Sequence, residues 1–370
     1  MLQIALKLVM PLIQNIIFLC PYPIGQAPSQ RFRFEQYFEI LRASGFRVTV
    51  APFLSVGGWQ VLYQPGNYFK KLLALSRGFC LRWWQLFTLP AYHYVFIHRE
   101  AAPLGPPVFE WIISNLFRKK IIYDFDDAIW IPNTSHVNRA VAFLKGHGKV
   151  KHICSWSYKV SVGNDYLGNF AAKWNKQVVY NPTTIDTETL HNPALYPSKN
   201  KTGLCIGWTG SHSTLKYLDE LIPVFMQLQE EFPELTLRVI ADKPAALNLK
   251  LVEFVAWNKD TEIADLLQID IGIMPLTDDA WAKGKCGFKA LQYLALGIPA
   301  VVSPVGVNTI IVSHGTNGFV CTTTEDWLTA LRKLIRDSAL RKTMGTKGRI
   351  TVEQHYSVRS NTATFVGLFR

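Results

Sequence analysis

Several patterns that mark common protein classes are missing from this chain of 370 residues. Its six cysteines are scattered and form no C-x-x-C pair, which argues against a zinc site and against a disulfide framework. No apolar run is long enough to span a membrane without charges. The G-x-G-x-x-G dinucleotide fingerprint and the usual nucleic-acid-binding motifs are also absent. We therefore expect reduced thiols, as in a cytoplasmic protein, no dehydrogenase activity and no nucleic-acid partner.

Acidic residues are also few, but only in one half of the chain. Residues 1–185 hold 20 Lys and Arg against 8 Asp and Glu, a net charge of +12. Residues 186–370 hold 19 of each kind and are neutral. A basic excess confined to one half of the chain attracts polyanions. The partner that this charge indicates is a nucleic acid, an anionic membrane surface or a lipid phosphate.

The length fits two domains of roughly 180 residues, and an apolar fraction of 49% supplies a core for each. Near the N-terminus, Lys7 followed by an apolar run mimics a signal peptide. Pro11, Gln14 and Asn15 interrupt that run, so we interpret residues 16–19 as the first buried strand and not as an export signal.

The most informative stretch runs from residue 269 to residue 302. It predicts, in order, a strand, a loop, a helix and a second strand, at residues 269–274, 277–287, 288–296 and 300–302. In a parallel sheet such a loop lies at the carboxyl edge, where these folds bind ligands. Backbone N–H groups near Gly287 favour an anion, and Lys285 and Lys289 add two positive charges. The stretch therefore predicts a phosphate or diphosphate site.

This stretch resembles the donor-binding loop of retaining glycosyltransferases of family 4, which have the GT-B fold. The ending A-L-G-I-P-A-V-V, from Ala295, follows the family pattern. The two family glutamates fall on Gly284 and Gln292. In the family the second glutamate holds the ribose, and the amide of Gln292 can also hydrogen-bond hydroxyls. Three further strings, GQAPSQRFRFEQY, YDFDDAIW and GWTGS, are similar to those of a bacterial subgroup.

The resemblance implies an α/β fold of the GT-B type, in which two Rossmann-like, doubly wound parallel-sheet domains face a cleft. Residues 1–183 would form the acceptor-side domain, with a C-terminal helix at 356–370 crossing back to it. Residues 184–355 would form the domain that binds the nucleotide-sugar.

In the first domain, Gly25 permits close approach of a ligand to the backbone, and the resemblance places it near the donor phosphates. Arg31 and Arg33 fall in the first turn of a helix predicted at 29–44, where cations oppose the helix dipole. An anionic ligand would explain them, and solvated arginines are the alternative. His98 ends a predicted strand at 94–97 and is either catalytic or a hydrogen-bonded scaffold residue.

Three carboxylates follow the next strand, at Asp124, Asp126 and Asp127, and their mutual repulsion suggests a site. The resemblance places Asp126 or Asp127 where the wider family has a residue that contacts sugar or acceptor. For Asp124 we expect a role as a cap of the following loop. A D-x-D pair binds metal in another glycosyltransferase fold, but the GT-B resemblance implies metal-independent catalysis.

The second domain opens with a predicted strand at 204–206. A glycine-rich turn follows, expected to wrap phosphates, and consists of Gly207, Trp208, Thr209, Gly210 and Ser211. Trp208 stands where the family has an arginine, and Lys216 lies slightly beyond the family's lysine. The resemblance places Trp257 at the nucleotide base, where it either stacks on the base or packs on the sheet, and it places Gly287, Phe288 and Gln292 beside the donor.

Residues 66–90 combine aromatic and basic side chains at helical spacing. Five of them share one predicted helical face: Leu72, Ser76, Phe79, Trp83 and Phe87. The pattern fits an interfacial membrane helix and also a helix packed on the sheet, and we favour the packed helix.

The resemblance implies a glycosyltransferase of the hexosyltransferase type that retains the anomeric configuration, by substitution on one face of the sugar. Its co-substrate would be a UDP- or GDP-linked sugar, with no further cofactor and no metal. The acceptor would be a glycan or a lipid-linked intermediate of bacterial surface polysaccharide, lipopolysaccharide or glycolipid. We expect the cytoplasm, with peripheral attachment to the inner face of the plasma membrane as a further option. Two alternatives stay open: a non-catalytic nucleotide-sugar-binding protein, and a GT-B epimerase or hydrolase.

Overall fold

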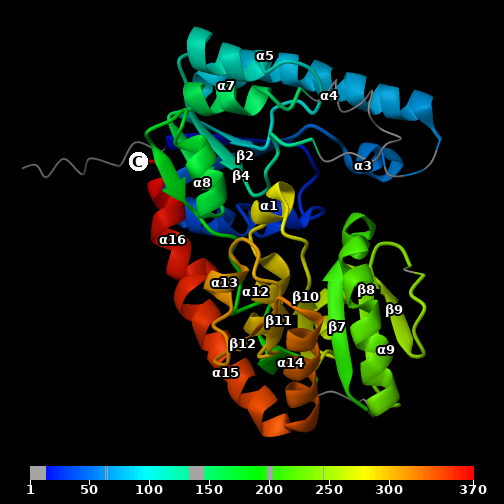
Figure 1. Ribbon diagram of the computed structural model, residues 1–370. Coiled ribbons are helices and arrows are strands. Elements are labelled where there is room, and N and C mark those ends of the chain that lie inside the picture. The colour runs from blue at the N-terminus through cyan, green and yellow to red at the C-terminus, as the bar shows by residue number, and fades with distance from the viewer. Residues whose placement is uncertain (1–13, 63, 65, 133–145, 198–202, 245) are drawn as a thin grey trace, which may run out of the picture.

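The computed structural model describes residues 14–370 except 63, 65, 133–145, 198–202 and 245 (Figure 1). The first half of the chain forms a six-stranded parallel sheet in the order β2-β1-β3-β4-β5-β6. Its strands are β1 (Gln14–Cys20), β2 (Phe46–Pro52), β3 (Tyr94–His98), β4 (Lys120–Phe125), β5 (Lys159–Val162) and β6 (Val178–Tyr180).

The second half forms another six-stranded parallel sheet, in the order β12-β11-β10-β7-β8-β9. Its strands are β7 (Cys205–Gly210), β8 (Thr236–Ala241), β9 (Val252–Ala256), β10 (Ile271–Met274), β11 (Ala300–Val302) and β12 (Gly318–Val320). The chain changes direction across this sheet between β7 and β10, and across the first sheet between β1 and β3. Such switch points are where open parallel sheets bind ligands.

Helices cover both sheets. Those of the first half are α1 (Pro28–Arg31), α2 (Phe38–Ala43), α3 (Val56–Leu62), α4 (Tyr68–Thr88), α5 (Val108–Trp111), α7 (Lys149–Trp156) and α8 (Asp165–Ala171). Those of the second half are α9 (Ile222–Glu231), α10 (Glu262–Leu266), α11 (Ala280–Lys283), α12 (Phe288–Ala295), α13 (Asn308–Ile311), α14 (Thr324–Arg336), α15 (Ser338–His355) and α16 (Val358–Gly367).

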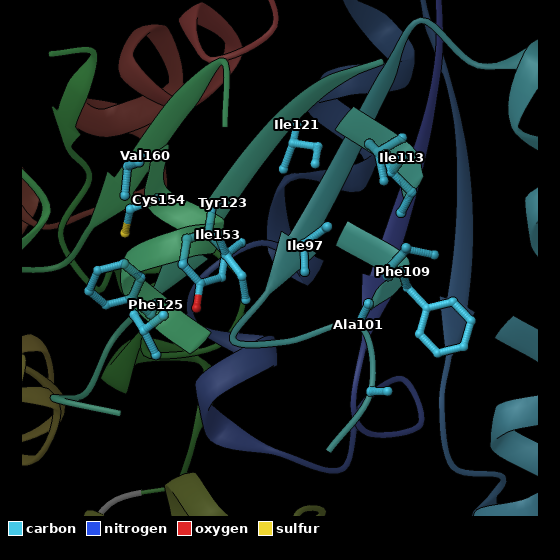
Figure 2. Close-up of a cluster of buried hydrophobic side chains, with 14 of the residues drawn as sticks. Ile97, Ala101, Phe109, Ile113, Ile121, Tyr123, Phe125, Ile153, Cys154 and Val160 are labelled. Carbon is cyan, nitrogen blue, oxygen red and sulfur yellow. The ribbon is translucent and has the colours of Figure 1, made fainter. Parts of the chain in front are cut away.

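The inner strands β3, β4 and β10 are short apolar runs that are buried on both faces, as the middle of a parallel sheet requires. One core lies between the middle of the first sheet and helices α5 and α7, where Ile97, Ile121 and Val160 meet Phe109 and Ile153 (Figure 2). The last helix, α16, returns to the opposite face of this sheet. Its Phe365 stacks on Tyr37 with ring centroids 4.2 Å apart. The boundary at residues 183 and 184 stays a prediction.

One predicted helix differs in the structure. The helix predicted at 29–44 is broken into α1, a 3-10 helix at Glu35–Tyr37 and α2. In the second half, a 3-10 helix at His212–Leu221 leads into α9.

The helix predicted at 29–44 breaks where Arg33 turns into the protein. Its side chain is buried and forms an ion pair with Asp124, and it also donates to the backbone carbonyl of Asn181. Asp124 accepts further hydrogen bonds from His98 Nδ1, at 2.8 Å, and from Ser161 Oγ, at 2.6 Å. Burial opposes the charge of Asp124, but Arg33 and His98 outweigh it and hold the pKa of this carboxyl far below its usual range.

We predict that Arg33→Met lowers the free energy of unfolding by about 3–5 kcal/mol, because it leaves the Asp124 carboxylate buried without its main counter-charge. Urea denaturation measures the loss. Arg47→Met, at an exposed position of β2, is the matched control and is expected to change stability by less than about 0.5 kcal/mol. Equal losses in the two variants would contradict the prediction.

Candidate functional site

The candidate site lies where the carboxyl edges of the two sheets face each other. The loop after β10 and the start of α12 come from the second sheet, and the segments after β3 and β4 come from the first. Contacts join these segments directly: Cys286 Sγ lies 3.1 Å from the carbonyl oxygen of Asp126, and Asn164 Nδ2 donates to the carbonyl of Lys285 at 3.0 Å. The carboxyl edges of the two sheets therefore meet at these segments.

The N-terminus of α12 carries the positive charge of the site. Gly287 caps it with φ +68°, and a Cβ at this position would lie 2.2 Å from Ile311 Cδ1, so only glycine fits. The first N–H groups of a helix have no intrahelical partner and attract anions. Lys285 precedes this end and Lys289 lies in its first turn. Burial, with a smaller effect of Lys285, lowers the pKa of Lys289 to about 7.

Lys289 passes over the end of β7. Its Nζ lies 5.4 Å from the centroid of the Trp208 ring, and a Cβ on Gly210 would come within 2.9 Å of Lys289 Cε. Gly210 therefore leaves the space through which the lysine reaches the cleft. Lys216 joins the same region: its Nζ lies 5.2 Å from the ring of Tyr217, and Lys285 Nζ lies 6.0 Å from that ring.

The prediction of a glycine-rich turn at residues 207–211 is wrong, because β7 continues to Gly210. Gly207 is a packing glycine whose Cβ would lie 2.2 Å from Ile269 Cγ1. Trp208 is fully buried in the core, so its side chain is not a phosphate ligand. The N–H of Thr209 donates to Tyr293 Oη at 3.0 Å. Only Gly210 and Ser211 reach the edge of the sheet.

The first sheet contributes two carboxylates. Asp126 and Asp127 each lie 2.7 Å from Arg99 Nη2, and Arg99 holds a left-handed backbone conformation with φ +62°. Burial and the charge of Asp126 raise the pKa of Asp127, while Arg99 and Lys285 act in the opposite direction. Asp127 also acts electrostatically on Lys289. The structure thus brings together all four residues predicted as catalytic, Asp126, Asp127, Lys285 and Lys289, and adds Arg99, which the sequence analysis did not identify.

His98 and Asp124 lie beneath these groups. His98 is fully buried and bonded to Asp124, as a scaffold residue would be, and its Nε2 lies 4.0 Å from Asp126 Oδ1. The prediction that Asp124 caps the following loop is wrong. It lies inside β4 and bonds Arg33, because a carboxylate so deeply buried needs a counter-charge.

A second group of predicted residues gathers around Glu262. This carboxylate forms an ion pair with Arg31 at 2.7 Å and accepts from Gln292 Nε2 at 3.2 Å and from Trp257 Nε1 at 3.4 Å. Glu262 and Gln292 are almost fully buried. Glu262 was missed by the sequence analysis, since a single acid at the start of a short helix carries no distinctive signal.

Two more predicted residues border this group. The ring of Phe288 packs on that of Phe32, with centroids 4.4 Å apart, so Phe288 joins the halves of the molecule. A Cβ on Gly25 would lie 2.8 Å from Lys259 Nζ. The placement of Arg31 in the first turn of a helix is wrong, because α1 is four residues long and Arg31 ends it. The anions that Arg31 and Arg33 meet in this structure are Glu262 and Asp124.

Gly284, where the resembling family has a glutamate, lies against the first sheet. A Cβ there would come within 2.7 Å of the backbone nitrogen of Ala128. No side chain larger than that of glycine fits this contact. The segment after β4 therefore occupies the space that a glutamate side chain would need. Among the described residues, no three His, Cys, Asp or Glu side chains are grouped so that they could hold a metal ion.

Comparisons with known proteins agree with this geometry. Residues 196–351 match the family described as glycosyl transferases group 1. No curated protein sequence matches the chain. A sucrose-phosphate synthase from Thermosynechococcus elongatus has a similar structure, with 14% identity, a TM-score of 0.69 and coverage of 96% of this chain and 98% of that one. Anabaena HepE, solved with UDP and glucose, shows 18% identity, a TM-score of 0.62 and the same coverage.

A third similar structure is that of Staphylococcus aureus TarM, solved with fondaparinux, α-GlcNAc-glycerol and UDP. It shows 13% identity and a TM-score of 0.58, over 79% of this chain and 59% of that one. With two facing parallel sheets and these neighbours, the chain has the GT-B fold. The family match and the fold together support a glycosyltransferase.

We predict that Gly284→Ala lowers the free energy of unfolding by about 1–3 kcal/mol, because the added methyl group meets the Ala128 backbone and forces the two edges apart. Thermal denaturation and small-angle scattering measure the loss and any opening of the cleft. Gly57→Ala, whose Cβ would meet nothing within 4 Å, is the matched control and is expected to leave both unchanged or to stabilise slightly. The prediction would be contradicted if Gly284→Ala had the same melting temperature and the same radius of gyration as the wild type.

Proposed function

We propose that this chain is a glycosyltransferase that moves a sugar from a nucleoside-diphosphate donor to a glycan or lipid-linked acceptor, with retention of configuration. One observation carries the proposal: Cys286, which lies between Lys285 and the start of α12, is 3.1 Å from the carbonyl oxygen of Asp126, so the two lysines at this helix end lie opposite the carboxylates of the first sheet. A cationic helix N-terminus can bind the diphosphate of the donor. A carboxylate opposite it can accept hydrogen bonds from the hydroxyl groups of a sugar. The match over residues 196–351 supports the same reaction class.

The donor would bind mainly to the second sheet. Its diphosphate would lie at the start of α12, between Lys285, Lys289 and the edge at Gly210. The nucleoside would extend toward Trp257 and Gln292. Glu262, hydrogen-bonded to Gln292, would supply the carboxylate that the resembling family carries at position 292 itself. UDP is the first nucleotide to test, since HepE and TarM were both solved with UDP.

In the transfer, the bond between the anomeric carbon and the diphosphate oxygen breaks, and the acceptor oxygen bonds to that carbon on the same face. The acceptor proton passes to the departing diphosphate oxygen, so charge and atoms balance. Negative charge develops on the diphosphate as the bond breaks. Lys285, Lys289 and the helix N-terminus would stabilise that charge, which is the largest electrostatic contribution that these residues offer. Asp126 and Asp127, held by Arg99, would orient sugar or acceptor hydroxyls.

A thermal-shift screen of the purified protein against UDP, GDP, ADP and their common sugars, without metal, tests donor binding. We expect one nucleotide to raise the melting temperature by a few degrees and Lys285→Ala and Lys289→Ala to reduce that rise. Lys342→Ala, an exposed lysine on α15, is the matched control and should respond like the wild type. No response to any nucleotide would overturn the proposal. Binding without release of nucleotide in the presence of glycan or lipid-linked acceptors would favour a non-catalytic binding protein.

The lowered pKa of Lys289 gives donor binding a pH dependence. In the free protein this lysine loses its proton near pH 7, whereas a bound diphosphate favours the charged form and raises the pKa. Binding above pH 7 therefore requires uptake of a proton. We predict that the Kd for a nucleotide-sugar rises by up to about tenfold per pH unit between pH 7.5 and 9.

Isothermal titration at several pH values, in buffers of different ionisation enthalpy, measures the affinity and the proton uptake together. A nucleotide-sugar is the suitable ligand because its diphosphate does not titrate in this range. Lys289→Arg keeps the charge at every pH and should remove the dependence. A wild-type Kd that is independent of pH, or a dependence that persists in Lys289→Arg, would show that Lys289 does not contact the diphosphate.

A further inference from the structure

Helix α4 turns a stripe of large apolar side chains toward solvent. Six of them are between 51% and 78% exposed: Phe69, Leu72, Leu73, Trp83, Trp84 and Phe87. At 3.6 residues per turn these positions fall on one side of the helix, which we name the outer face of α4. Soluble monomers rarely expose continuous apolar surface of this kind unless it binds a partner or a membrane.

The inner face of α4 fixes this orientation. Gly78 lies so close to Phe53 that an added Cβ would be 2.4 Å from the Phe53 ring. Arg82 is buried and donates to the backbone carbonyls of Ala101, Ala51 and Cys20 at 2.6, 2.8 and 3.0 Å. These bonds hold the helix on the first sheet, so rotation of α4 cannot bury its outer face. The prediction that Leu72, Trp83 and Phe87 face the sheet is wrong.

Positive charge accompanies the outer face. Lys70, Lys71 and Arg77 lie on α4, and Lys70 and Arg77 are exposed. The helix contains no Asp or Glu, and none occurs between Glu39 and Glu100. Apolar and aromatic side chains interleaved with lysine and arginine match the boundary of an anionic lipid bilayer, where the rings enter the acyl region and the cations meet phosphates.

The helix lies on the side of the first sheet that faces away from the second sheet (Figure 1). Its 21 residues span about 30 Å, which is long enough to rest along a surface. No helix among the described residues is both long and apolar enough to cross a bilayer. A surface in contact with it would not obstruct the cleft between the sheets.

We propose that the outer face of α4 docks the protein on an anionic membrane surface. A second copy of the chain is the less suitable occupant. A two-fold contact through α4 would bury Lys70 and Arg77 against a copy of the helix that offers no acid to pair with them. The inference does not depend on the proposed transferase reaction, although it would bring the protein to acceptors carried on lipid.

Sedimentation with vesicles tests the docking, using the full chain without donor or acceptor. Vesicles of phosphatidylcholine are compared with vesicles that also contain phosphatidylglycerol. We expect binding to the anionic vesicles only, weakening as salt is raised. Trp84→Ser with Phe87→Ser should weaken binding by about tenfold or more, because both side chains leave the acyl boundary. Lys70→Glu with Arg77→Glu should weaken it by a similar factor through loss of charge.

The control pair is Leu195→Ser with Met226→Ser, two exposed apolar residues of the second half, and it should bind as the wild type does. All substituted side chains are exposed or half-buried, and unchanged melting temperatures would show that every variant is folded. Failure of the wild type to bind anionic vesicles would overturn the proposal, as would full binding by Trp84→Ser with Phe87→Ser. A dimer in sedimentation equilibrium that this variant abolishes, without vesicle binding by the wild type, would assign the face to a second copy.

Discussion

The buried ion pair between Arg33 and Asp124 is the interaction on which the arrangement of the cleft depends. Asp124 lies next to the carboxyl end of β4, and its partners come from the segment after α1, from β3 and from β5. Arg33 also reaches the carbonyl of Asn181, just beyond β6. One charge pair therefore ties together the carboxyl edge of the first sheet. The site residues that the first sheet contributes lie along this edge.

The same pair directs the neighbouring residues outward. Because Arg33 turns into the first sheet, the chain leaves its helix there, and Phe32 and Arg31 point to the second sheet. Phe32 packs on Phe288, and Arg31 pairs with Glu262. The two sheets are thus joined by an aromatic contact and a buried ion pair at one end of the cleft, and by the close contact of Gly284 with Ala128 near the acids.

Much of the fold could be predicted from the sequence, and the predictions that were wrong have identifiable physical causes. In the stretch at residues 269–302 both strands and the helix after the loop were predicted, because their patterns are local, whereas the loop also holds the short helix α11. Trp208 was misplaced because two glycines close together suggest a turn, whereas here Gly207 is required by the approach of Ile269. Glu262 and Arg99 went unrecognised because their partners lie far along the chain, at Arg31 and at Asp126. The first pairing joins the two sheets and the second joins the ends of two strands of the first sheet, so neither leaves a local pattern.

Helix α4 shows most clearly how a polar contact can override a hydrophobic pattern. By apolar content alone, the stripe that holds Trp83, Trp84 and Phe87 should face the sheet. The inner stripe instead holds Gly78 and Arg82. Near the end of β1, the end of β2 and the segment after β3, backbone carbonyls converge, and the guanidinium of Arg82 satisfies three of them. Leaving those buried acceptors without a donor would cost about 1–3 kcal/mol each, comparable to the gain from burying a large apolar side chain. Because the carbonyls need Arg82 and the close approach to Phe53 needs Gly78, the helix has one orientation, and its aromatic residues are left on the outside.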